Sequence, residues 1–227
     1  MAADAKVGLR QLITALRSRA VKSSWDHKEL AGIKEQSWER MKAKAPKQVA
    51  ALQDMRNAIP EDGFIVSGIT NMGAWSTIAF DALKPRTYIT SSYMGTLGYA
   101  FPTSLGVKVG NPDRAVVALC GDGGFMYALG ELATAVQYGI NVVAVVFNNH
   151  IYGASNRDQH LRFGGRVVGT QLHTPDFVKL AESFGAMGIK VPRLEDSPDA
   201  IRRAIKAKRP TVIEVEMPAE LDPPYYM

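Results

Sequence analysis

The stretch CGDGGFMYALGELATAVQYGINVVAVVFNNHIYG, residues 120–153, decides the expected fold of this chain. It follows one apolar, β-branched run, AVVALC (115–120), passes through a helical segment, and enters a second run, VVAVVF (142–147). A strand, a helix and a second strand in this order are typical of a βαβ unit, in which the two strands are parallel. If the two strands are neighbours, the polar residues that follow them, Asp122 and Asn149, lie at the same edge of the sheet.

The same alternation continues on both sides of this unit. Further short β-branched runs occupy residues 64–68, 87–91, 187–191 and 211–217, and helical segments at 72–83, 99–110, 128–139, 175–185 and 197–208 separate the runs. Apolar strands that alternate with amphipathic helices are typical of a parallel sheet covered on both faces. The sequence therefore predicts an α/β fold: a three-layer, doubly wound, mostly parallel sheet of about six strands.

The amino-terminal quarter differs from the rest. Residues 1–58 carry no strand pattern, and apolar residues at helical spacing predict helices, beginning with an amphipathic helix at the amino terminus. The segment SSWDHKELAGIKEQ (23–36) is expected to be an exposed linker. We predict a helical extension and linker over 1–58, an α/β domain over 59–217 and a Pro-rich tail over 218–227.

The composition limits the classes of function. A hydrophobic share of 46% supports a sizeable core, and a net charge of +5 is too modest to indicate a nucleic-acid partner. No run of about 18 apolar residues and no signal peptide is present in the sequence, so we expect neither a membrane span nor secretion. The single cysteine, Cys120, lies in an apolar run, which indicates a buried thiol rather than a nucleophile and fits the cytoplasm.

Four polar or glycine-rich loops follow expected strands, at 67–71, 91–98, 121–124 and 148–153. Ligands of open α/β sheets bind beyond the carboxyl ends of the strands. A carboxylate, an amide oxygen and a backbone carbonyl are hard ligands suited to Mg²⁺, and the bare N–H groups of a glycine-rich helix start favour a phosphate. Together these loops indicate a diphosphate that is bridged to the protein through Mg²⁺.

Each motif also has a simpler interpretation when it is taken alone. The sequence GDGG is a common turn, and paired asparagines after a strand often form a turn or a helix cap. The dinucleotide pattern G-x-G-x-x-G is not met, because Met126 stands at its last position. The joint spacing of the two motifs favours the metal–diphosphate interpretation.

The sequence Gly121-Asp122-Gly123, then 24 residues, then Asn148-Asn149 resembles the signature of thiamine-diphosphate-dependent enzymes, in the family of acetolactate synthase, benzoylformate decarboxylase and pyruvate decarboxylase. The resemblance covers about residues 60–217, which look like the C-terminal, diphosphate-binding domain of that family. It implies thiamine diphosphate and Mg²⁺ as cofactors.

The resemblance implies a role for individual residues. Asp122, Asn149 and the backbone carbonyl of Ile151 match the Mg²⁺ ligands of the family. Backbone N–H groups of the two glycine-rich loops are expected to hold the diphosphate, at Gly121, Gly123, Gly124, Tyr152 and Gly153.

Two further positions match the family's site for the rest of the cofactor. Leu97 lies where the family places an apolar wedge that bends the cofactor, although chemistry alone would make it a core residue. Gly95 matches the position whose carbonyl accepts a hydrogen bond from the aminopyrimidine. Asn71 stands where acetolactate synthases use a glutamine near the diphosphate.

The chain also departs from the family's pattern. Met72 cannot replace the histidine that follows this glutamine, because a thioether donates no hydrogen bond. Ser155 stands where pyruvate decarboxylases of the yeast type carry a glutamate six residues after the second asparagine. The stretch around 137–154 looks closer to the benzoylformate decarboxylase and carboligase branches.

In this family a glutamate of a separate pyrimidine-binding domain activates the cofactor, and about 60 helical residues before the α/β domain are too few to form that domain. The resemblance therefore implies a split enzyme, in which a second subunit brings this domain and its glutamate to a hetero-oligomer, a heterotetramer or larger. The alternative is a fragment of a longer protein; Met1 followed by the small Ala2 favours a native start.

The implied function is that of an acetolactate-synthase-like carboligase or lyase, acting on a small 2-oxo acid or 2-hydroxy ketone. The alternatives are a subunit of a two-component 2-oxo acid decarboxylase and a non-catalytic scaffold that binds the cofactor. The basic segment 154–177 is expected to be a long loop, in which Arg157, His160, Arg162 and Arg166 either bind a substrate carboxylate or form a solvated surface.

Overall fold

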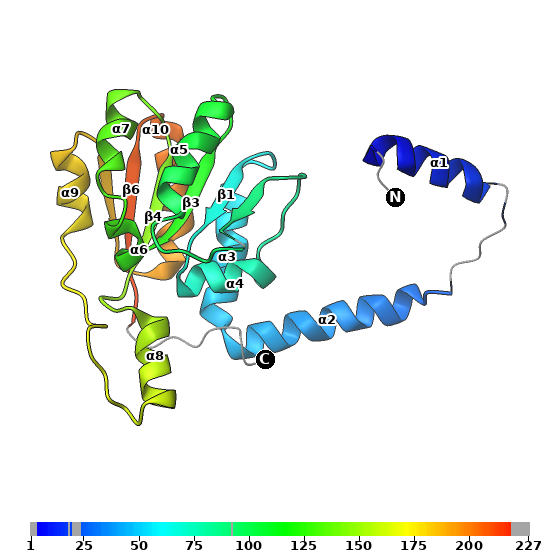
Figure 1. Cartoon of the computed structure of the whole chain (residues 1–227). Helices are drawn as coiled ribbons and strands as arrows, with labels where there is room; N and C mark the ends of the chain where they lie inside the picture. Colours follow the sequence, from blue (N-terminus) through cyan, green and yellow to red (C-terminus); the bar gives the residue numbers. More distant parts are fainter. Residues whose placement is uncertain (1–3, 18, 20–23, 92, 219–227) are drawn as a thin grey trace. The chain divides into compact units, whose positions relative to one another are not determined.

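The computed structural model of the chain describes residues 4–17, 19, 24–91 and 93–218 (Figure 1). They belong to two compact units, Met1–Glu39 and Arg40–Met227. Residues 219–227 of the predicted tail lie outside the described residues. None of the helices in the described ranges combines the length and the apolar character that a membrane span needs.

The first unit contains α1 (Ala5–Arg17) and the first part of α2 (His27–Lys44). Helix α1 confirms the predicted amino-terminal helix. The expectation of a linker over 23–36 is wrong from His27 onward, where α2 begins, but most of these residues are exposed as expected. This segment is helical because it is rich in the strong helix formers Lys, Glu, Leu and Ala and contains no proline.

The second unit contains a six-stranded sheet with the strand order β2-β1-β3-β4-β6-β5. The strands are β1 (Phe64–Ser67), β2 (Tyr88–Thr90), β3 (Val116–Gly121), β4 (Val143–Asn148), β5 (Met187–Val191) and β6 (Thr211–Glu216). Every neighbouring pair is parallel. The predicted α/β fold is confirmed, and the sheet is parallel throughout.

Helices cover both faces of the sheet (Figure 1). They are α3 (Pro46–Ala58), α4 (Asn71–Ala79), α5 (Ala100–Gly110), α6 (Asp122–Met126), α7 (Glu131–Gln137), α8 (Gly153–Arg162), α9 (Phe177–Ser183), the 3₁₀ helix η1 (Leu194–Asp196) and α10 (Ser197–Ala207). Helices α5, α7 and α9 pack on one face, and α3 packs against α4 and α10 on the other. Helix α3, which the sequence-based division assigns to the extension, is part of the second compact unit.

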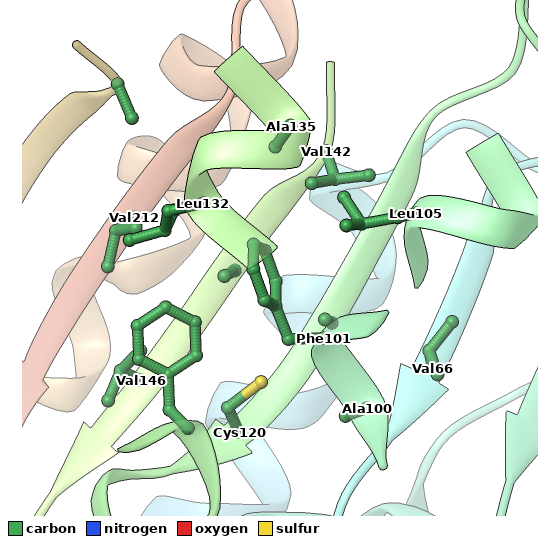
Figure 2. Packing of buried hydrophobic residues seen from close by; sticks show 14 of the residues in the cluster. Val66, Ala100, Phe101, Leu105, Cys120, Leu132, Ala135, Val142, Val146 and Val212 are labelled. Carbon is green, nitrogen blue, oxygen red and sulfur yellow. The ribbon is translucent and has the colours of Figure 1, made fainter. Parts of the chain in front are cut away.

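The core between the sheet and α5, α6, α7 and α9 is apolar and aromatic. Figure 2 shows Leu132 beside Val212, and the same apolar cluster contains Phe101 and the strand residues Val146 and Cys120. The ring of Phe125 in α6 lies edge to face with that of Phe101, with centroids 5.0 Å apart, and with that of Phe177, at 5.8 Å. This packing fixes α6 on the end of β3, directly beside the polar loops.

Two predicted segments differ from the structure. The helix expected over 128–139 is shorter, because hydrogen bonds from Ala128 N to Phe125 O and from Glu131 N to Ala128 O span three residues and form tight turns between α6 and α7. The segment expected to be a long loop, 154–177, begins with α8. The chain after α8 folds back on it, since Gln159 exchanges two side-chain hydrogen bonds with the backbone of Val168.

Cys120 is buried, and this burial raises the pKa of its thiol to about 12. Because the thiolate is the reactive form, we expect iodoacetamide to leave the folded protein unlabelled at mildly alkaline pH and to label it fully after unfolding in guanidinium chloride. Mass spectrometry of both samples measures the labelling. Rapid labelling of the folded protein would show that Cys120 is accessible and ionised.

Candidate functional site

The loops after β3 and β4 lie side by side at the carboxyl edge of the sheet. The two strands are neighbours, with Gly121 paired to Phe147 in the register. The Oδ2 atom of Asp122 accepts a hydrogen bond from the backbone N–H of His150, at 2.8 Å. The structure therefore brings Asp122 to the loop that carries Asn149 and Ile151.

Asp122 is a buried carboxylate, with 3% of its surface exposed. Burial raises the pKa of the Asp122 carboxyl above its ordinary value, and N–H groups of Gly123 and His150, which donate to it, oppose this shift. A cation beside Asp122 would offset the desolvation of its charge. The site thus favours a bound cation on electrostatic grounds.

The oxygen atoms near Asp122 determine which metal would fit. In the part of the chain that the structure describes, no three His, Cys, Asp or Glu side chains gather to form a metal site. The sequence-predicted set contains one carboxylate, from Asp122, with the Asn149 amide and the Ile151 carbonyl as neutral oxygens. A small set of hard oxygen ligands completed by phosphate and water fits Mg²⁺, whereas it lacks the soft ligands of zinc sites.

The loops after β1 and β4 contact the loop after β3 at its glycines. A Cβ atom added at Gly121 would lie 3.3 Å from Cβ of Thr70, in the loop after β1. A Cβ atom added at Gly123 would overlap the ring of Tyr152, at 2.9 Å from Cδ1, and would lie 3.0 Å from Leu172. Position 123 therefore requires glycine, because any side chain there would displace Tyr152.

The loop after β2 reaches the same place. The Cδ2 atom of Leu97 lies 3.8 Å from the point where a Cβ atom of Gly124 would stand, and Gly98 N lies at the same distance. Gly95 has a φ of +56°, in the left-handed region that favours glycine. The half-buried Leu97 thus lies beside the start of α6.

The remaining predicted residues flank this centre. Asn71 is the first residue of α4 and is half-buried. Gly153 begins α8, and a Cβ atom there would lie 3.9 Å from Nδ2 of Asn149. Burial raises the pKa of the Tyr152 phenol, and a hydrogen bond to Tyr127 adds to the shift. Tyr127 was not among the site residues predicted from the sequence.

The basic residues after β4 differ in their surroundings. In α8, Arg162 forms an ion pair with Asp158 at 3.5 Å. Arg166 donates a hydrogen bond from Nε to the carbonyl of Phe163. Arg157 is half-buried in α8, and its Nε has no hydrogen-bond partner in the described part of the chain. Of these arginines, Arg157 is the one whose Nε is buried without a hydrogen-bond partner among the described residues.

A polar network beside this site was not predicted from the sequence. Oε1 of Glu214 in β6 accepts a hydrogen bond from Asn148, at 2.9 Å, and another from Lys190 of β5, at 2.7 Å. The run TVIEVEM, residues 211–217, predicts a strand. It also contains a signal of this network at Glu214, because a glutamate inside a strand that is covered on both faces is an exception among buried residues.

This chain is similar to known proteins in sequence and in fold. A family model described as the thiamine pyrophosphate (TPP) enzyme, C-terminal TPP binding domain, matches residues 68–215. Thiamine pyrophosphate is another name for thiamine diphosphate. The chain is 34% identical to a sulfoacetaldehyde acetyltransferase of Castellaniella defragrans, over 93% of this chain and 38% of the relative. It is 36% identical to the acetolactate synthase large subunit of Haemophilus influenzae, over 66% of this chain and 26% of the relative.

A solved structure is also similar, that of the thiamine diphosphate-dependent 4-hydroxybenzoylformate decarboxylase of Rhodococcus jostii RHA1. The TM-score is 0.70 and the identity 31%, over 76% of this chain and 33% of the other. This chain thus spans only part of its relatives: 38% of the length of the acetyltransferase and 26% of the length of the acetolactate synthase subunit. The resemblance seen in the sequence is confirmed: the chain belongs to the family of thiamine-diphosphate-dependent enzymes and matches the C-terminal cofactor-binding domain of that family.

Proposed function

We propose that this chain is the diphosphate-binding subunit of a thiamine-diphosphate- and Mg²⁺-dependent enzyme that makes or cleaves a carbon–carbon bond next to a carbonyl, as acetolactate synthase does. The observation that carries the proposal is the meeting of buried Asp122 with the 149–151 loop at the carboxyl edge of the sheet. In this proposal residues 59–217 form the cofactor-binding domain, 1–58 are its extension, of which α3 packs on the domain against α4 and α10, and 218–227 are a tail.

The oxygens of Asp122, Asn149 and the Ile151 carbonyl would hold Mg²⁺, which neutralises the diphosphate. The N–H of Tyr152 donates to the carbonyl of Thr170 and that of Gly123 donates to Asp122, so the diphosphate contacts predicted for these two N–H groups do not fit the structure. The N–H groups of Gly121, Gly124 and Gly153 would bind the diphosphate oxygens. Because α6 has only five residues, these N–H groups carry more of the binding than the helix dipole does. Asn71 would approach the diphosphate from the start of α4.

Leu97 and Gly95 would act on the remainder of the cofactor. When bound, thiamine diphosphate supplies a carbon nucleophile and an electron sink for a carbonyl substrate. The Leu97 side chain beside Gly124 would press the cofactor into the bent shape that the family uses. The carbonyl of Gly95 would accept a hydrogen bond from the aminopyrimidine and so hold that ring in place.

The partner would be a second subunit with the pyrimidine-binding domain and its activating glutamate. Large side chains are exposed at the carboxyl edge: Tyr93 is 97% exposed, Met94 76% and Tyr127 67%. Such exposed apolar and aromatic groups beside a binding site are typical of a protein interface. The short coverage of the relatives supports the need for further domains, and the single buried thiol fits assembly in the cytoplasm.

A second candidate is a subunit of a two-component 2-oxo acid decarboxylase, which the structural similarity to a decarboxylase favours. The two candidates share the cofactor site and differ in the fate of the bound carbon fragment. A ligase passes this fragment to a second carbonyl compound, whereas a decarboxylase releases it as an aldehyde.

The test is reconstitution with a polypeptide that carries the pyrimidine-binding domain, such as one encoded beside this chain. We expect no turnover of pyruvate by this chain alone, and Mg²⁺-dependent formation of a hydroxy ketone by the pair. Release of an aldehyde alone would select the decarboxylase, and turnover unchanged by Asp122→Ala would indicate a non-catalytic scaffold. Full turnover by this chain alone would contradict the split site.

A further inference from the structure

Glu214 is a buried carboxylate that the proposed cofactor site does not use. It lies in β6 with 1% of its surface exposed, between Val146 of β4 and Lys190 of β5 in the register. Because a buried carboxylate is desolvated, it is retained only where partners compensate for its charge. An apolar residue would fill this buried position without the free-energy cost of desolvating a charge. The presence of a glutamate here therefore indicates that its contacts have a role.

One oxygen of Glu214 makes the contacts. Oε1 accepts hydrogen bonds from Lys190 Nζ at 2.7 Å and from Asn148 Nδ2 at 2.9 Å. Lys190 also donates to Oε2 of Glu216, at 3.0 Å. Burial tends to lower the pKa of Lys190, but its hydrogen bonds to the two glutamates outweigh burial and raise it. The ammonium group therefore stays charged and balances Glu214.

Asn148 connects this buried charge pair to the loop after β4. It is the last residue of β4, 1% exposed, and directly precedes Asn149. The Oδ1 atom of Asn148 accepts a hydrogen bond from Thr174 Oγ1 at 3.2 Å, and the same hydroxyl is 2.6 Å from Nδ1 of His150. The amide of Asn148 is thus fixed from both ends, by Glu214 and by Thr174.

His150 is the residue that needs this support. Its φ is +58°, a left-handed conformation that a residue with a side chain adopts only at a cost in energy. In this conformation its N–H donates to Asp122 and its ring lies between Thr174 and Glu216, with Nε2 3.3 Å from Oε1 of Glu216. The hydrogen bonds on both sides of the turn hold the strained backbone in place.

We propose that Glu214 is a positioning residue, which through Asn148 and Thr174 fixes the 148–151 turn so that the Asn149 amide and the Ile151 carbonyl would be in place to hold a metal together with Asp122. The inference rests on the proposed function, because it assigns these two residues as metal ligands. In this role Glu214 is not itself a ligand, and it acts on cofactor binding through the shape of the turn.

The test measures binding of thiamine diphosphate by calorimetry at saturating Mg²⁺, on the full chain with its partner. In Glu214→Leu, Asn148 loses the oxygen that accepts its hydrogen bond, and the 148–151 turn loses the interaction that holds Asn148 in place. We expect the affinity to fall about 10- to 100-fold, as on loss of a group that orients a metal ligand. Glu214→Gln keeps an acceptor oxygen for Asn148 and should retain most of the affinity.

Val215→Ala is the matched control for stability. Val215 is a fully buried neighbour of Glu214 whose side chain points to the other face of β6. This variant should lower the melting temperature of the protein without changing the affinity for the cofactor. If Glu214→Leu does not fold, Thr174→Val carries the test, since it removes the hydroxyl that joins Asn148 to His150 and keeps the side-chain size.

The outcomes separate the inference from the proposed function. Wild-type affinity in Glu214→Leu, or in Thr174→Val where it is the variant used, overturns the positioning role while the cofactor site stands. Equal losses of affinity in Glu214→Leu and Val215→Ala would also overturn it, because they would reflect stability alone. If the wild-type protein shows no Mg²⁺-dependent binding, the proposed function itself fails.

Discussion

Asp122→Asn is expected to weaken Mg²⁺-dependent binding of thiamine diphosphate by about 100-fold or more, because even groups that only orient a metal ligand contribute about 10- to 100-fold. The substitution removes the one carboxylate of the expected ligand set and keeps its size. The amide oxygen can still accept the hydrogen bond from His150 N–H, so the fold should persist. Calorimetric titration with the cofactor at saturating Mg²⁺ measures the loss.

Asp113→Asn is the matched control for this experiment. Asp113 is exposed and precedes β3, whereas Asp122 follows the same strand at its other end. The control removes the same charge far from the cofactor edge and should leave the affinity unchanged. An affinity in Asp122→Asn as high as that of the wild-type protein would mean that Asp122 does not hold the metal.

Phe125→Ala is expected to lower the free energy of unfolding by about 3–5 kcal/mol, the usual loss for a buried phenylalanine. Phe125 is 1% exposed and its ring contacts those of Phe101 and Phe177, so alanine would leave a cavity at the centre of this layer. Because Phe125 belongs to α6, the variant should also loosen the loop that begins at Asp122. Urea unfolding followed by circular dichroism measures the change in stability.

Tyr138→Ala provides the comparison for this loss of an aromatic ring. Tyr138 is 69% exposed after α7, and its removal should change the free energy of unfolding by no more than about 0.5 kcal/mol. A loss below about 1 kcal/mol in Phe125→Ala would contradict the packing of α6 described above, since truncated core aromatics rarely have so small an effect.

The strands and the edge that carries the site were predictable from the sequence because the signal is local. Each strand is a short β-branched run between turn residues, and parallel neighbours place their carboxyl ends together. This rule predicts that Asp122 and the loop with Asn149 lie at the same edge of the sheet. The strand order was not predictable, because β6 lies between β4 and β5 through contacts that are distant in the sequence.

Tertiary contacts decided the features that the sequence did not reveal. Hydrogen bonds of Gln159 and Thr170 fold the chain after α8 back onto it, and no local propensity predicts this pairing. The role of Glu214 depends on Asn148, which lies 66 residues away in the chain. A single glutamate within a strand pattern shows that a charged residue is buried there, but it does not show which residue is its hydrogen-bond partner.

This chain is proposed to hold the diphosphate end of the cofactor through a metal. Titration of the chain with thiamine diphosphate and with thiamine, each with Mg²⁺ and with EDTA, is a direct test of this claim. We predict that thiamine diphosphate binds to the chain in the presence of Mg²⁺, and that this binding is weak because the partner is absent. EDTA should abolish the binding, and thiamine should not bind under either condition. Equal binding of thiamine and thiamine diphosphate, or binding that EDTA leaves unchanged, would contradict the claim.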